Sequence, residues 1–167
     1  MPRAFRDLIA CGVLASAREP FDPMEKAFHA LARRGLTGSE AMTGSDWTLA
    51  RTYALRSEFL AMSQAWNGAG VEDDLVVAAK GAPEAIAELC RMTPEARVAL
   101  SASIDAMAAA GLRVLGVARA SFRGSELPHS QRISVSTSSD WSGSPIRCAR
   151  ACQSPLPNAV PLASKSS

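Results

Sequence analysis

The sequence predicts a mixed α/β or α+β fold, in which helices cover a sheet. Three observations lead to this prediction. A well-capped helix occupies residues 22–35, two short strand candidates follow it as a hairpin, and strands and helices then alternate over residues 75–120. The length of 167 residues is typical of one domain, and 47% of the residues are hydrophobic, which is enough to build a core.

Two helices are expected before the first strand. The apolar stretch 8–15 is short and no convincing cleavage site follows it, so we interpret it as a helix rather than a signal peptide. Asp22 can cap the next helix, with Pro23 in the first turn and Glu25 reaching back to the cap, and Gly35 ends it. Its apolar face has helical spacing: Met24, Phe28 and Leu31.

Three strand candidates follow a polar loop at residues 37–46. Residues 48–55 and 59–66 are rich in residues that favour strands, and we expect them to pair as a hairpin. A turn at residues 67–70 leads to the third strand, residues 75–79, which is wholly apolar. A continuous apolar run of this length is typical of a buried strand.

Two more helices and a last strand complete the predicted order. A helix over residues 83–91 is followed by a second one, which Thr93 caps and Gly111 ends. The expected buried face of this second helix consists of Leu100, Ile104 and Met107. Residues 112–120 form the last predicted strand.

The end of the third strand carries a candidate phosphate site. Lys80 is a lone cation at the end of the apolar run, Gly81 allows close approach to the backbone, and Pro83 suits a first helical turn. The free N–H groups of the helix start and the helix dipole favour an anion beside the lysine. Taken alone this pattern is weak, and a plain strand-to-helix connection is the simpler interpretation.

Four segments in order strengthen the hypothesis. They are residues 22–27 (Asp-Pro-Met-Glu-Lys-Ala), residues 53–56 leading to Met62-Ser63, residues 80–84 (Lys-Gly-Ala-Pro-Glu) and residues 111–118 (Gly-Leu-Arg-Val-Leu-Gly-Val-Ala). Together they resemble the nucleotide-binding domain of bacterial-type cation-transporting P-type ATPases, over roughly residues 9–131. The resemblance implies an antiparallel sheet flanked by helices and a ligand, ATP, bound as Mg-ATP.

The same resemblance implies roles for individual residues. Asp22 would accept a hydrogen bond from the adenine amino group, although its carboxylate equally suits a helix cap. Lys80 and Gly81 would lie beside the nucleotide. Arg113 would reach the phosphates when the domain closes on its partner domain, whereas its simpler interpretation is an exposed strand charge.

Leu55 marks a departure from the family pattern. Many members have there a phenylalanine that stacks on adenine, and an aliphatic side chain stacks less well. Tyr53 or Phe59 would compensate if its ring faced the site. A lysine usual in the family before the Met-Ser pair is also absent, with Leu60 in its neighbourhood. We therefore expect weak nucleotide binding.

The family's other parts are not found in this sequence. In P-type ATPases the nucleotide phosphorylates an aspartate of a separate domain, and membrane helices carry the ion. We find no Asp-Lys-Thr-Gly-Thr segment and no apolar run that could span a bilayer, so we expect a cytoplasmic fragment that is not an enzyme as it stands. The alternatives are an independent nucleotide-binding or interaction module, or the non-functional product of a disrupted gene.

Other classes of function are disfavoured. Basic and acidic residues nearly balance within residues 1–131, which argues against nucleic-acid binding. The four cysteines and two histidines do not form a metal-ligand spacing. The resemblance further implies that the domain is incomplete at its N-terminus and lacks early strands, so we expect marginal folding, with Trp47, Leu49 and Trp66 left without partners.

Residues 132–167 differ in character, being rich in serine and proline without an amphipathic element. A disordered tail is one interpretation. Read in a shifted frame, however, codons for residues 133–149 permit Gly-Leu-Val-Gly-Leu-Ala-Asp-Pro-Leu-Arg. This segment resembles the family's return from the nucleotide domain to the phosphorylation domain. We therefore hypothesise one domain over residues 1–131 and an out-of-frame tail.

Sequencing the encoding DNA through the codons for residues 127–135 tests this hypothesis. We expect a frame-changing insertion or deletion that joins the domain to the shifted segment, with an aspartyl phosphorylation motif upstream. An intact frame without pump-like flanking sequence would contradict it.

Overall fold

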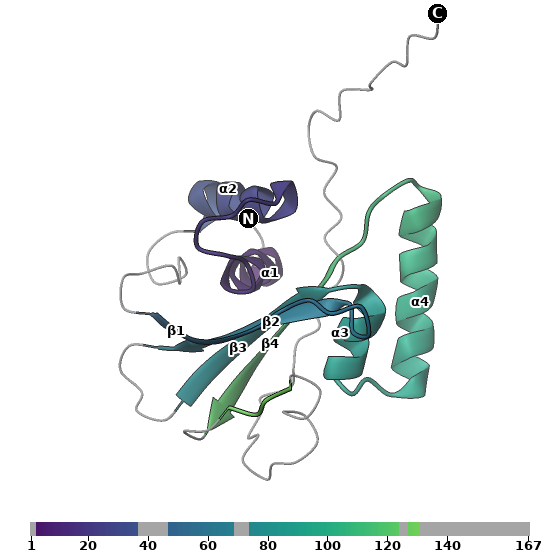
Figure 1. Cartoon of the computed structure of the whole chain (residues 1–167). Helices are drawn as coiled ribbons and strands as arrows, with labels where there is room; N and C mark the ends of the chain where they lie inside the picture. The colour runs from purple at the N-terminus through teal and green to yellow at the C-terminus, as the bar shows by residue number, and fades with distance from the viewer. Residues whose placement is uncertain (1–2, 37–46, 69–73, 124–126, 131–167) are drawn as a thin grey trace, which may run out of the picture.

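The computed structural model describes residues 3–36, 47–68, 74–123 and 127–130. Within these ranges, four strands form one antiparallel sheet in the order β1-β2-β3-β4 (Figure 1). Helices flank the sheet, so the predicted α+β class with an antiparallel sheet is confirmed. The predicted tail, its boundary at residue 131 and the loop at residues 37–46 lie outside the described residues.

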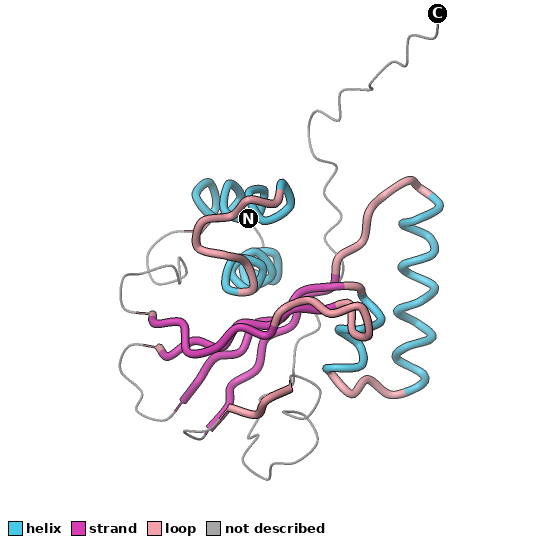
Figure 2. Tube along the Cα trace, viewed as in Figure 1, coloured by secondary structure: helices cyan, strands magenta, loops and turns pink. Residues whose placement is uncertain are grey.

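The helices and strands follow the predicted order with shifted ends (Figure 2). They are α1 (Arg3–Leu14), α2 (Pro23–Gly35), β1 (Thr48–Tyr53), β2 (Ala61–Asn67), β3 (Asp74–Gly81), α3 (Pro83–Leu89), α4 (Pro94–Ala109) and β4 (Gly116–Arg123). None of the described helices is long and apolar enough to cross a bilayer.

Among the strands, the largest shift is at the start of β4, which lies at Gly116 instead of residue 112. The end of α4 explains the difference. Gly111 takes a left-handed φ of 75°, and the Leu112 N–H donates to the Met107 carbonyl at 3.0 Å. Leu112 is therefore still engaged in ending the helix and cannot begin a strand ladder.

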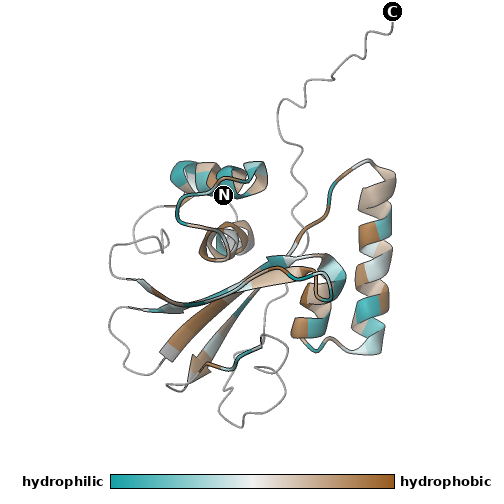
Figure 3. Ribbon diagram, viewed as in Figure 1, coloured by the Kyte–Doolittle hydropathy of each residue, from teal (hydrophilic) through white to brown (hydrophobic). Residues whose placement is uncertain are grey.

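One face of the sheet lies against α1, and α2 packs outside α1 (Figure 1). Figure 3 shows brown, apolar segments on the strands and mostly teal, polar segments on α2. The helices approach closely at Gly12, where an added Cβ would lie 2.3 Å from the Phe28 ring. A side chain at residue 12 would thus push α2 away from α1.

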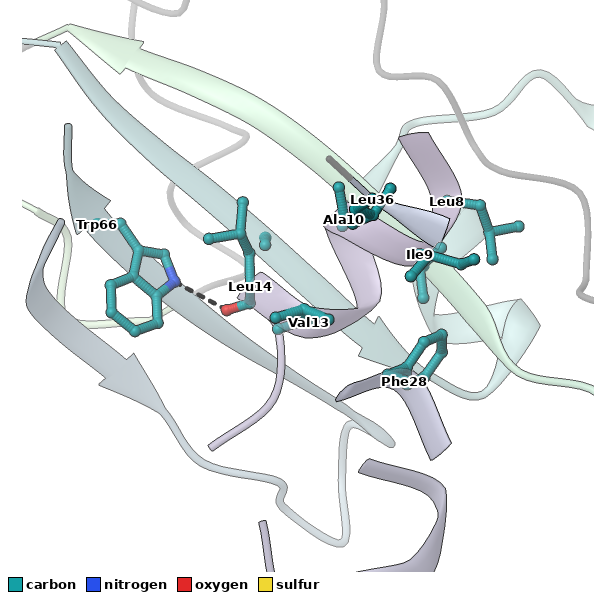
Figure 4. Close-up of a cluster of buried hydrophobic side chains, with 12 residues drawn as sticks. Leu8, Ile9, Ala10, Val13, Leu14, Phe28, Leu36 and Trp66 are labelled. Atoms are coloured by element: carbon teal, nitrogen blue, oxygen red, sulfur yellow. Dashed lines mark hydrogen bonds between the residues drawn. The ribbon is translucent and has the colours of Figure 1, made fainter. Parts of the chain in front are cut away.

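Trp66 belongs to the core beneath α1 (Figure 4). It is 4% exposed, and its indole N–H donates to the Leu14 carbonyl at 2.8 Å. Trp47 is half-buried against the same cluster, whereas Leu49 remains 46% exposed. The expectation that these side chains lack partners is therefore wrong for Trp66 and Trp47, because α1 covers the sheet where they lie.

The opposite face of the sheet packs against α3. Its buried cluster comprises Phe59, Ala61, Ala79, Ala85, Ile86 and Ala118. The outer helix α4 contacts α3, and of its predicted apolar face only Met107 is buried, while Leu100 and Ile104 are half-buried. This face is thus sealed mainly by the short helix α3.

A segment after β4 is fastened to the edge strand β1. Arg51 Nη1 donates to the carbonyls of Leu127 and Pro128 at 2.8 and 3.0 Å. The Tyr53 hydroxyl donates to the Pro128 carbonyl at 2.6 Å. Side chains from β1 thus hold a stretch more than seventy positions later in the chain.

Replacing Tyr53 with phenylalanine should lower the free energy of unfolding by about 1 kcal/mol, because one hydrogen bond is lost.

Burial raises the pKa of Tyr53 above its usual 10.0, although Arg51 acts in the opposite direction. The fold favours the neutral phenol, so its contribution is complete below pH 10.0 and is lost as pH rises through the folded-state pKa. Urea unfolding from pH 8 to 11, roughly spanning this window, should show less alkaline loss in Tyr53→Phe. Equal pH dependence in both proteins would contradict this role.

Candidate functional site

One end of the sheet gathers the connections that carry the candidate residues. β2 begins at Ala61, β3 ends at Gly81 and β4 begins at Gly116, and Gly81 pairs with both of the others. Leu55 lies in the β1–β2 connection and Arg113 in the α4–β4 connection, which open at this end. The topology therefore brings three distant candidate segments to one edge of the fold.

The Lys80 ammonium ties the helices to this end of the sheet. Lys80 is 8% exposed, its Nζ donates to Ser16 Oγ at 3.0 Å, and it forms an ion pair with Glu25. Ser16 follows α1, and Glu25 lies in the first turn of α2. Lys80, the only charged residue at the end of the apolar run in sequence, is thus paired with a carboxylate from a distant segment.

Glu25 also differs from its prediction. It was expected to reach back to the helix cap, but its carboxylate contacts Lys80, 55 positions away. An Asp-x-x-Glu pattern at a helix start indicates a capping box, and nothing local to residues 22–25 reveals a partner on a strand. The local pattern therefore predicts a cap role for Glu25, and only the tertiary structure reveals its contact with Lys80.

The Lys80 side chain points away from the helix that follows it in sequence. Side chains alternate along a strand, and Ala78 lies in the cluster beneath α1 whereas Ala79 packs against α3. Lys80 therefore shares the α1 face. The start of α3 lies on the other face, and its cap residue, Ala82, makes no side-chain hydrogen bond. The prediction that Lys80 and the N–H groups of α3 would hold one anion between them is therefore wrong, because the two lie on opposite faces of the sheet.

Gly81 has a packing reason to be glycine. An added Cβ would lie 2.2 Å from the Leu60 carbonyl oxygen and 2.5 Å from Ala61 Cα. The backbones of β2 and β3 therefore need a residue without a side chain here. Close approach of backbone to backbone, rather than of backbone to phosphate, is what the structure displays at Gly81.

Asp22 caps α2 with only one of its two carboxylate oxygens. Its Oδ1 accepts hydrogen bonds from the N–H groups of Met24 at 2.8 Å and Glu25 at 3.3 Å. Its other carboxylate oxygen accepts none from the described residues, and the residue is exposed. Capping and ligand recognition therefore do not compete for the same oxygen.

The aromatic residues proposed to replace the missing phenylalanine are buried. Tyr53 is 8% exposed and Phe59 6% exposed, so neither offers a ring face to a ligand. Leu55 is 60% exposed, and Arg113 is exposed in the connection between α4 and β4. Leu55 and Arg113 can thus reach a ligand, whereas the two buried rings serve the core.

Buried polar groups under α1 complete the surroundings of Lys80. Ser16 is 1% exposed and donates to the Gly12 carbonyl at 2.7 Å, so its hydroxyl is inaccessible as a nucleophile. Gln64 is 5% exposed, and with its amide nitrogen facing α1 it donates to the carbonyls of Leu14 and Ser16, both at 3.0 Å. Each of these groups is satisfied, which marks the cluster as structural support.

Metal-binding side chains do not gather in the described part of the chain: no group of three or more His, Cys, Asp or Glu residues that could hold a metal ion occurs there.

Comparison with known proteins finds no match: no protein-family model matches the chain, and none of the curated proteins does.

Replacing Lys80 with methionine should lower the free energy of unfolding by about 2 kcal/mol, because Glu25 would be left nearly buried without its cation. The double variant Lys80→Met/Glu25→Leu should recover most of this loss, since it removes the orphaned carboxylate as well. Urea unfolding of both variants measures the two changes. If the single variant is as stable as the parent, the ion pair does not hold the helices to the sheet.

Proposed function

We propose that this chain binds ATP, as Mg-ATP, at the end of the sheet marked by Lys80, and that it is the nucleotide-binding part of a cation-transporting P-type ATPase. The contact between Glu25 and Lys80 carries the proposal. It joins two of the four family-like segments, residues 22–27 and residues 80–84, although they are far apart in sequence. A single binding site can be made from these two segments only if they lie next to each other in the folded chain.

Different residues at this site are suited to different parts of the nucleotide. The unused carboxylate oxygen of Asp22 is suited to accept the adenine amino group. The exposed guanidinium of Arg113 is suited to the phosphates, whose charge the bound Mg²⁺ also offsets. Lys80 keeps the first turn of α2, and hence Asp22, in place against the sheet.

In this proposal the chain holds the nucleotide and does not itself transfer phosphate. The aspartate that accepts the phosphoryl group, and the membrane helices that carry the ion, belong to other parts of a larger pump, whose nucleotide domain faces the cytoplasm. Binding without turnover is therefore the activity to measure.

Replacing Asp22 with asparagine should reduce the preference of the protein for adenine over hypoxanthine and leave the fold intact. Asparagine caps a helix as well as aspartate does, but it offers an N–H donor where the free oxygen was. The parent protein should bind ATP about tenfold more tightly than inosine triphosphate, whose 6-oxo group accepts, and Asp22→Asn should reduce or reverse this preference. Isothermal titration calorimetry with Mg²⁺ present measures both affinities.

The control for this variant is its urea unfolding curve, which should match that of the parent. A folded parent protein that binds neither nucleotide at millimolar concentration would refute the proposed function.

A further inference from the structure

Phe21 is an aromatic ring left in water. It is 93% exposed, the highest value among the large apolar side chains described. The other described aromatic residues are buried or half-buried: Phe5, Phe28, Trp47, Tyr53, Phe59, Trp66 and Phe122. Folding gains almost nothing from a ring in this state, because its apolar area stays hydrated.

The ring lies next to the acceptor described above. Phe21 immediately precedes Asp22, and the Lys26 ammonium lies 5.6 Å from the ring centroid. Phe21 therefore contacts the first turn of α2. The residue before a helix cap usually packs there against an apolar side chain, whereas here it meets a cation. Because the partner is a single cation and the exposure is so high, most of the ring remains available.

We propose that Phe21 is the surface on which the purine base stacks, taking the role for which Leu55 offers only an aliphatic side chain. The inference rests on the nucleotide binding proposed above. A planar base on Phe21 would bring its exocyclic group near Asp22, the neighbouring residue, and would bury apolar area that the folded chain leaves in water. The ligand class is a purine nucleotide.

A purely structural role for Phe21 makes a different prediction. If the ring only positions the start of α2, leucine should replace it without effect on ligands, since an aliphatic side chain also packs there. Stacking needs an aromatic face, so leucine should fail and tryptophan should succeed.

The test uses the full chain and two probes, ATP and inorganic tripolyphosphate, each with Mg²⁺, in isothermal titration calorimetry. Phe21→Leu should weaken ATP binding by roughly 5- to 100-fold and leave tripolyphosphate binding unchanged, because only the base is affected. Phe21→Trp should restore or tighten ATP binding. Val98→Ala is the matched control at an exposed apolar residue of α4, outside the proposed site, and should change ATP binding by less than about threefold.

Three other results are informative. Equal ATP affinity in the parent protein and Phe21→Leu overturns stacking and leaves nucleotide binding intact. Loss of both ATP and tripolyphosphate binding in Phe21→Leu, together with a lower melting temperature, shows that the ring supports the fold and also overturns stacking. A cooperatively folded parent that binds no ATP overturns both this inference and the proposed function.

Discussion

The ammonium of Lys80 is the group on which the arrangement of this molecule depends. A lysine that is only 8% exposed must be paired, because a buried charge without a partner is strongly unfavourable. Ser16 and Glu25 meet that requirement from the end of α1 and the start of α2. The need to pair one cation therefore sets where two helices lie over the sheet, and with them the residues that precede α2.

The small residues of the central strands allow helices to pack on both faces. Ala78 and Ala79 are adjacent in β3, yet one lies under α1 and the other under α3. Gly81 continues this pattern, since the neighbouring strand leaves no room for a Cβ. The sheet end that carries the proposed site is thus a place where loops and helix termini meet above tightly packed strands.

The side chains at the start of α2 differ in their surroundings. Glu25 points into the fold and is used for stability, whereas Phe21 and the second oxygen of Asp22 remain open to a ligand. A ligand held by the open groups would depend on the buried ones for its geometry. Nucleotide binding and the docking of α2 would then be coupled, although they use different atoms.

Local sequence was sufficient to predict the order of the helices and strands, the cap at Asp22 and the end of α4 at Gly111, because capping and alternation act over a few residues. The site residues could be proposed from their motifs, but their surroundings could not. The pairing of Lys80 with Glu25 and the burial of Tyr53 arise from contacts between distant segments, and Phe21 is exposed because no distant segment covers it among the described residues. Which way a side chain faces, and what meets it there, is set by packing across the whole sheet, and no short stretch of sequence contains that information.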